Sequence, residues 1–242
     1  MIHKIGPGAQ LRQERGEHDL PHVSRWLAAI LFPFHATFMR RYFRIEVSGE
    51  GNRPASGPFK LAPTHRSRWD AFMLYCAVSR RLLYFMTSHD EVAGFQGWFM
   101  RRMGAFPINT QRPSPSVIRS CNEMIARGEA LVIFPEGNLF YYKPGEVHPL
   151  KPGVAWLALK FQKTFDASDL PIIPVRLIYG DRRLRPGSRA KIVVGEPISV
   201  SQHAGLPVKE GVTALTSILQ DALGDVINRA SSVESLRDAV SA

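Results

Sequence analysis

A short apolar strand pattern passes directly into a polar loop and a helix start in Phe59-Lys60-Leu61-Ala62-Pro63-Thr64-His65-Arg66-Ser67-Arg68-Trp69-Asp70. We expect a strand over Phe59–Ala62, a loop that carries His65, and a helix over Ala71–Val78. A strand, a loop and a helix in this order form the repeating unit of an α/β fold. In such folds, functional side chains collect where the parallel strands end.

The imidazole of His65 and the carboxylate of Asp70 lie five positions apart in this stretch. In one continuous helix such side chains would point about 140° apart, so His65 must lie on the loop before the helix. With Ser67 as N-cap, a Ser-x-x-Asp capping pattern would turn the Asp70 carboxylate back towards that loop. There it would accept a hydrogen bond from one ring nitrogen and make the other more basic. The pair predicts a general base for a hydroxyl; a plain helix cap is the alternative.

A second apolar strand pattern ends in a carboxylate at Leu131-Val132-Ile133-Phe134-Pro135-Glu136-Gly137. A glycine after the carboxylate lets a substrate approach the backbone closely. If the two strands are parallel, Glu136 and His65 emerge at the same edge of the sheet. We therefore expect Glu136 and Gly137 to belong to the same site, with a turn that carries a solvated glutamate as the alternative.

Strand and helix patterns alternate along the rest of the chain, and a C-terminal amphipathic helix closes it. The further expected strands are Phe43–Val47, Leu82–Thr87, Ala105–Ile108, Ala130–Phe134, Ile172–Ile178 and Lys191–Val194. The further expected helices are Phe95–Met103, Ser116–Arg127, Gly153–Phe161 and the stripe of Val212, Leu215, Ile218, Leu219, Ala222 and Val226. This order predicts an α/β fold with a mainly parallel or mixed central sheet covered by helices.

The N-terminal part of the chain holds an apolar run over Trp26–Met39. The run is several residues shorter than the roughly twenty that a helix needs to span a bilayer. We expect a helical segment over Trp26–Tyr42, broken near Pro33, that lies at a membrane interface; a core helix is the alternative. Residues 1–42 would form a leader and this apolar helical segment, and residues 43–242 the main domain.

The chain of 242 residues carries 31 Lys and Arg against 21 Asp and Glu, a formal net charge of +10. Basic residues stand beside aromatic ones, as in Trp98-Phe99-Met100-Arg101-Arg102, which is typical of a contact with an anionic bilayer surface. No zinc finger, RNP-like strand pair or KH-type GxxG loop is present, so we expect no nucleic-acid partner.

The cysteines and the first twenty residues indicate in which cellular compartment the protein is expected. Cys76 and Cys121 stand apart, without a CxxC pattern, which indicates free thiols in a reducing environment. The first twenty residues are polar and mixed in charge, unlike a secretory signal. We expect a cytoplasmic protein, peripheral on the inner face of a membrane.

The segments around His65 and Glu136, followed by Pro171-Ile172-Ile173-Pro174-Val175, resemble the glycerolipid acyltransferase family, which includes the 1-acylglycerol-3-phosphate acyltransferases. The resemblance runs from about residue 43 to residue 198. Further similar blocks are Gly104-Ala105-Phe106-Pro107-Ile108-Asn109, Lys151 with Gly153, and Gly195-Glu196-Pro197-Ile198. The resemblance makes residues 43–242 an acyltransferase domain.

This resemblance implies that a fatty acyl group moves from acyl-CoA or acyl-carrier protein to a hydroxyl of a lysophospholipid or related glycerolipid. His65 would remove the proton from that hydroxyl, which attacks the thioester, and Asp70 would orient His65. Apart from the donor as co-substrate, no cofactor and no metal would be required. The implied substrate-binding residues are Glu136, Gly137, Arg112, Lys151, Gly104 and Asn109.

The chain departs from the family pattern where phosphate-binding arginines are expected. Thr110 stands at the end of the second block, and Asn138-Leu139-Phe140 replaces Thr-Arg-Ser after Glu136-Gly137. Arg112, Lys143 or Lys151 would then supply the positive charge that binds a phosphate. The alternatives are an acyltransferase for an aminolipid or another lysolipid, and a membrane-binding member of the fold without turnover.

Overall fold

The computed structural model describes residues 23–77, 81–88, 94–108, 115–140, 146–164, 169–181 and 184–240. Its strands are β1 (Arg44–Ser48), β2 (Phe59–Pro63), β3 (Leu83–Ser88), β4 (Ala105–Ile108), β5 (Ala130–Val132), β6 (Ile172–Tyr179) and β7 (Arg189–Val194). Its α-helices are α2 (Arg25–Tyr42), α3 (Asp70–Ala77), α4 (Gly94–Arg102), α5 (Pro115–Ala126), α6 (Gly153–Thr164) and α7 (Val208–Val240). Two 3₁₀ turns, η1 (Glu50–Asn52) and η3 (Ser201–His203), complete the described elements.

The strands form one seven-stranded sheet in the order β1-β7-β6-β2-β5-β3-β4. Neighbouring strands are parallel except for β6 and β7, which are antiparallel. The expected α/β fold with a mainly parallel, mixed sheet is confirmed. Strand β2 lies at the centre, with Leu61 opposite Val132 of β5 and Ile173 of β6. The loops after β2 and β5 therefore leave the sheet at the same edge.

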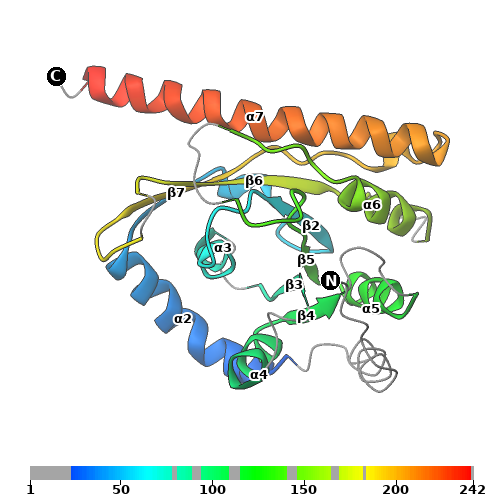
Figure 1. Ribbon diagram of the computed structural model, residues 1–242, viewed down its shortest axis with the longest axis horizontal. Helices are drawn as coiled ribbons and strands as arrows, with labels where there is room; N and C mark the ends of the chain where they lie inside the picture. The colour runs from blue at the N-terminus through cyan, green and yellow to red at the C-terminus, as the bar shows by residue number, and fades with distance from the viewer. Residues whose placement is uncertain are drawn as a thin grey trace, which may run out of the picture.

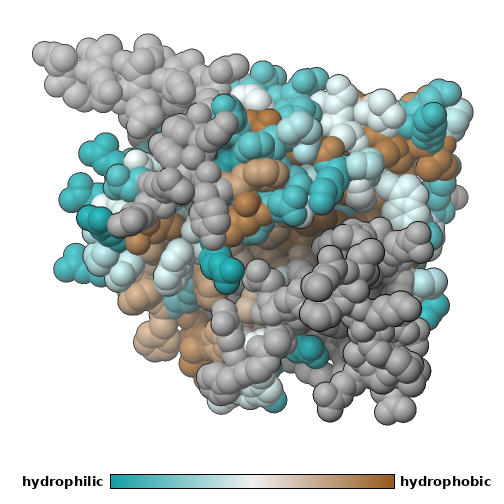
Figure 2. Space-filling view, in the orientation of Figure 1, coloured by the Kyte–Doolittle hydropathy of each residue, from teal (hydrophilic) through white to brown (hydrophobic). Residues whose placement is uncertain are grey.

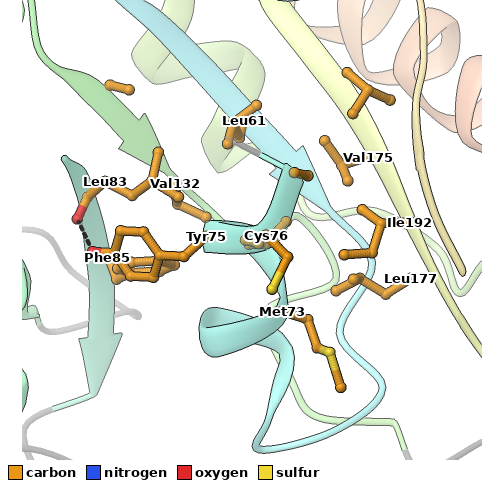
Figure 3. Packing of buried hydrophobic residues seen from close by; sticks show 14 of the residues in the cluster. Leu61, Met73, Tyr75, Cys76, Leu83, Phe85, Val132, Val175, Leu177 and Ile192 are labelled. Carbon is orange, nitrogen blue, oxygen red and sulfur yellow. Dashed lines mark hydrogen bonds between the residues drawn. The ribbon is translucent and has the colours of Figure 1, made fainter. Parts of the chain in front are cut away.

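Helices cover both faces of the sheet: Figure 1 shows α6 and α7 on one side, and α2 and α3 on the other. Successive side chains of a strand point to opposite faces. Accordingly, Leu61 packs in the cluster of α3, whereas Ala62 packs with Leu215 and Leu219 of α7. Figure 3 shows the first cluster, in which the hydroxyl of Tyr75 donates to the carbonyl of Leu83 at 3.1 Å.

The N-terminal helix differs from the expectation in one respect. Helix α2 runs unbroken from Arg25 to Tyr42, so the break expected near Pro33 is wrong. A proline removes one backbone donor and can bend a helix without ending it. Met39 of α2 is buried in the same core as β2, and Nε2 of His35 lies 2.9 Å from the carbonyl oxygen of Phe72 in α3. None of the helices in the described ranges has the length and apolarity needed to cross a membrane.

Candidate active site

The loop between β2 and α3 holds His65 against the first residue of the helix. The Nδ1 atom of His65 lies 2.8 Å from Oδ2 of Asp70, whose side chain is completely buried. The backbone N–H groups of Arg66 and Ser67 donate to the same oxygen at 2.6 and 2.9 Å. In return, the hydroxyl of Ser67 accepts from the N–H of Trp69 at 3.2 Å. The predicted cap and the predicted His65–Asp70 hydrogen bond are both present, because the cap turns the carboxylate towards the loop.

The second oxygen of Asp70 accepts a hydrogen bond from the hydroxyl of Tyr179, at the end of β6. Burial, the Asp70 charge and this hydrogen bond raise the pKa of Tyr179 well above its usual range, so the hydroxyl remains a donor. A carboxylate so surrounded only accepts, so Nδ1 of His65 carries the proton and Nε2 is left as the basic nitrogen. The ring is partly exposed and stacks on Phe134 at 4.2 Å between centroids. The arrangement suits a general base.

Glu136 lies behind this loop, where both of its oxygens are occupied. Oε2 accepts from the backbone N–H of His65 at 3.0 Å and from Nη1 of Arg66 at 2.5 Å. Oε1 accepts from Nη2 of Arg66 at 2.7 Å and from the backbone N–H of His148 at 3.2 Å. The sequence predicts that Glu136 contacts the acceptor, but the buried carboxylate does not line the cavity. Its contacts join three loop segments, which suits a positioning role, and its contact with the acceptor stays a prediction.

Gly137 and Lys151 meet at the cavity. Gly137 has a φ of +67°, and a Cβ atom there would lie 2.7 Å from Nζ of Lys151. A side chain here would displace the lysine, and the positive φ favours glycine as well. The backbone N–H of Lys151 donates to the carbonyl of Pro135 at 2.8 Å, which fixes the origin of that side chain. The structure therefore brings both residues to the site, as the sequence predicts.

The cavity beside His65 has a volume of about 540 Å³. Most of its lining is apolar and includes Phe72, Tyr75, Phe85, Met100, Met103 and Leu157. Its polar lining includes His65, Arg68, Asn138 and Lys151, of which the last three are exposed. An apolar chamber with a cationic, solvent-exposed opening fits an amphipathic substrate with an anionic head.

Of the three other predicted residues, the structure describes only Gly104. Gly104 does not line the cavity; it has a φ of +99°, and a Cβ there would lie 2.2 Å from the Leu83 carbonyl oxygen, so the backbone requires glycine. Asn109 and Arg112 lie outside the described residues. In the described part of the chain, no group of three or more His, Cys, Asp or Glu could hold a metal ion.

Three residues of the site are not among those predicted from the sequence: Arg66, Arg68 and Tyr179. The two arginines stand inside the His65–Asp70 segment, and their position was the available signal for a role in the site. Tyr179 is the last residue of β6, beside β2 in the sheet, and strand order would have been needed to place it near Asp70.

Known proteins with similar sequences identify the family. The acyltransferase family profile matches residues 44–178, more than half of the chain. The 1-acyl-sn-glycerol-3-phosphate acyltransferase of Bacillus subtilis (strain 168) is 26% identical over 188 residues, covering 76% of this chain and 89% of that protein. A protein of the same name from Streptococcus pneumoniae (strain ATCC BAA-255 / R6) is 30% identical over 80 residues, 32% of this chain and 30% of that protein.

The fold also has a solved counterpart. The crystal structure of the 1-acyl-sn-glycerophosphate (LPA) acyltransferase, PlsC, from Thermotoga maritima superposes with a TM-score of 0.63. It is 17% identical, and the match covers 93% of this chain and 88% of that chain. The resemblance inferred from the motifs is confirmed. The chain belongs to the acyltransferase family and is an acyltransferase similar to the 1-acyl-sn-glycerol-3-phosphate acyltransferases.

Proposed function

We propose that this enzyme transfers a fatty acyl group from acyl-CoA or acyl-carrier protein to a hydroxyl of a lysophospholipid or related glycerolipid. The observation that carries the proposal is the His65–Asp70 pair at the opening of an apolar cavity. The names of the relatives from Bacillus and Streptococcus support a glycerolipid acceptor with a phosphate.

In the proposed reaction, Nε2 of His65 removes the proton from the acceptor hydroxyl as its oxygen attacks the thioester carbonyl. The buried Asp70 carboxylate, 2.8 Å from Nδ1, stabilises the imidazolium that forms. When the tetrahedral intermediate collapses, the carbon–sulfur bond breaks and the proton on Nε2 passes to the departing thiolate. The products are the acylated lipid and one free thiol, and the enzyme returns to its starting state without an acyl-enzyme.

The cavity lining suggests how the substrates are held. The apolar side chains would surround the acyl chain, since burying each methylene contributes about 0.8 kcal/mol. Lys151 and Arg68, the lysine and arginine of the described lining, would bind the acceptor phosphate with charge-assisted hydrogen bonds. They would replace the arginines that the family places at the positions of Thr110 and Leu139.

The surface of α2 supports attachment to a membrane. Trp26, Ile30, Phe34 and Phe38 recur at four-residue spacing, and their exposed fractions are 72%, 44%, 71% and 55%. Figure 2 shows hydrophobic surface at the lower left, where α2 lies in Figure 1. Arg40 and Arg41 occupy the last turn of α2. We therefore propose peripheral binding to the cytoplasmic face of an anionic bilayer, through this apolar row and adjacent cations.

The proposed reaction can be tested by following thiol release and lipid product. The enzyme would receive acyl-CoA or acyl-carrier protein with a lysolipid bearing a phosphate monoester, one with a capped phosphate, or an aminolipid. We expect His65→Ala to lower the rate by about 10²- to 10⁴-fold, and His203→Ala, remote from the cavity, to leave it unchanged. Equal thiol release by wild type and His65→Ala with every acceptor would refute the proposal. Lys151→Met should weaken use of the phosphate monoester more than that of the aminolipid.

Membrane attachment can be tested by flotation with vesicles that contain or lack anionic lipid. Replacing Trp26, Phe34 and Phe38 by serine should abolish flotation, because three exposed apolar anchors are lost. Serine at Leu206, Val208 and Ile218 is the matched control, since these exposed apolar residues lie near or on α7. Flotation that depends equally on the two sets would contradict attachment through α2.

A further inference from the structure

The segment 146–151 comes just before α6 in the chain and lies against the loop that carries His65. On its inner side, the backbone N–H of His148 donates to Oε1 of Glu136, and the carbonyl of Glu146 accepts from Nη2 of Arg66 at 2.9 Å. At the end of the segment, Lys151 is bonded through its backbone to Pro135. The segment thus carries a residue of the cavity and also completes the partners of Glu136.

On its outer side the same segment is held by helix α7. The side-chain amide of Gln220 accepts from the N–H of Leu150 at 3.1 Å and donates to the carbonyl of Val147 at 3.4 Å. An amide side chain is suited to this task, because one end accepts and the other donates.

Buried Arg176 of β6 adds a second link between α7 and the segment. Its Nη2 donates to the carbonyl of Glu146 at 3.3 Å, and its Nη1 donates to the carbonyl of Leu223 in α7 at 3.1 Å. Burial, with the nearby Arg66 charge, lowers the pKa of Arg176 to about 10, although Glu136 opposes this shift. At neutral pH the guanidinium remains a donor.

Packing fixes the position of α7 at this contact. Leu215, Leu219 and Leu223 are buried in the cluster against which Val147 and Leu150 pack. Gln220 itself is half-buried beside them. Gln220, which holds segment 146–151 from outside, therefore lies on a helix that is packed into the core, and α7 falls beyond the region 44–178 that the family profile matches.

We propose that Gln220 is a positioning residue, through which α7 holds segment 146–151 so that Lys151 enters the cavity in a fixed orientation. Loss of the amide would leave the N–H of Leu150 and the carbonyl of Val147 without these partners, and Lys151 follows Leu150 directly. The expected effect on acceptor binding rests on the proposed function of Lys151. The contact between α7 and segment 146–151 is independent of that function.

The test is Gln220→Leu, which keeps an apolar stem of similar size but removes both hydrogen bonds. We expect faster amide hydrogen exchange at Leu150 and His148, and an acceptor KM raised roughly fivefold, the effect of one ordinary hydrogen bond. The donor KM and kcat should stay within about twofold. Gln220→Glu keeps the acceptor for the N–H of Leu150, so it should restore most of the acceptor KM.

Gln162→Leu is the matched control. Gln162 is a buried glutamine of α6 whose Oε1 accepts from the N–H of Leu170 at 2.9 Å, and it does not line the cavity. This variant should lose comparable stability but keep the wild-type acceptor KM and the wild-type exchange at Leu150. A role of Gln220 in stability alone would make the two variants behave alike.

The two measurements separate the possible failures. Unchanged exchange at Leu150 and His148 in Gln220→Leu would overturn the inference, whatever the kinetics. Faster exchange with an acceptor KM equal to that of Gln162→Leu would overturn the positioning role. A wild-type enzyme that acylates none of the acceptors would refute the proposed function, and the exchange comparison would still decide whether α7 holds the segment.

Discussion

The two ends of strand β2 bury charged groups in different ways. At the C-terminal end, Asp70 and Glu136 have a donor on every carboxylate oxygen, and Glu136 forms a two-pronged ion pair with Arg66. At the N-terminal end, the ammonium of Lys60 is buried, and its Nζ donates to the carbonyl of Leu170 at 2.8 Å. Burial lowers the pKa of Lys60 to about 7, although the charge of Asp169 opposes this shift.

The difference shows that the charged groups near His65 are held in one position. Around His65, each buried charge is held by several donors, so the loop has one arrangement and the base has one tautomer. At Lys60 the folded protein can avoid the free-energy cost of a buried ammonium, because the side chain can lose its proton and become neutral. The first end should therefore be sensitive to substitutions that keep the shape of the side chain but remove its charge, and the second should be sensitive to pH.

The largest effect is expected when the charge of Glu136 is removed. Glu136→Gln leaves the buried Arg66 guanidinium without its counter-charge and places an amide N–H₂ against other donors. We expect the free energy of unfolding to fall by about 3–5 kcal/mol, measured by urea denaturation. The control is Glu123→Gln, whose partner Arg127 lies 3.7 Å away on the surface, and which should change stability by less than about 1 kcal/mol. Equal effects of the two changes would contradict the positioning role of Glu136.

The next effect concerns the charge of Asp70 alone. Asp70→Asn can keep the hydrogen bonds of one oxygen to Arg66 and Ser67, but it no longer stabilises the imidazolium. We expect the single-turnover rate to fall by about a hundredfold, or about 3 kcal/mol in the barrier. Asp169→Asn is the control, since Asp169 also accepts from two successive backbone N–H groups, those of Val200 and Ser201, and does not line the cavity. A full rate in Asp70→Asn would mean that Asp70 acts only as a helix cap.

A smaller effect is expected at the second oxygen of Asp70. Tyr179→Phe removes its donor and leaves that oxygen buried without this partner. We expect a loss of about 1–2 kcal/mol of stability and a rate several-fold below wild type, because the carboxylate is less firmly held. Tyr84→Phe alters another buried tyrosine, on β3, which does not line the cavity and should keep the full rate. If both variants kept the full rate, Tyr179 would be a packing residue.

The parts of the active site that depend on residues close together in the sequence were predictable. The Ser67–Asp70 cap and the turn of the carboxylate towards His65 follow from spacing within six residues, and alternating strand and helix patterns predicted the sheet. The partners of these groups were not predictable. Arg66 and Glu136 are 70 residues apart, and Tyr179 and Asp70 are 109 apart, so only the strand order brings them together.

A local signal also failed where packing decides. The proline in α2 predicted a break that the long helix does not contain. At Gly104 the close approach to the Leu83 carbonyl accounts for the glycine, and the role in substrate binding stays a prediction.

The smallest expected effect is the change of stability with pH that Lys60 causes at the N-terminal end of β2. Its sign follows from the number of protons bound by the folded and unfolded states. Between pH 7 and about 10, the unfolded chain keeps the Lys60 proton while the folded protein loses it, because the folded pKa is about 7 and the ordinary value is 10.5. The unfolded state then binds more protons, so stability rises with pH. Below pH 7 both states are protonated and the cost of burying the ammonium is fully present.

This contribution should amount to about 1 kcal/mol between pH 7 and pH 8, measured by urea denaturation at each pH. Lys60→Met keeps most of the side-chain volume and should remove the rise, while Lys163→Met, at an exposed position of α6, should keep it. An unchanged slope in Lys60→Met would mean that the buried ammonium keeps its proton in the folded protein. Both ends of β2 would then bury charged side chains, and they would differ only in the number of hydrogen bonds that hold each charge.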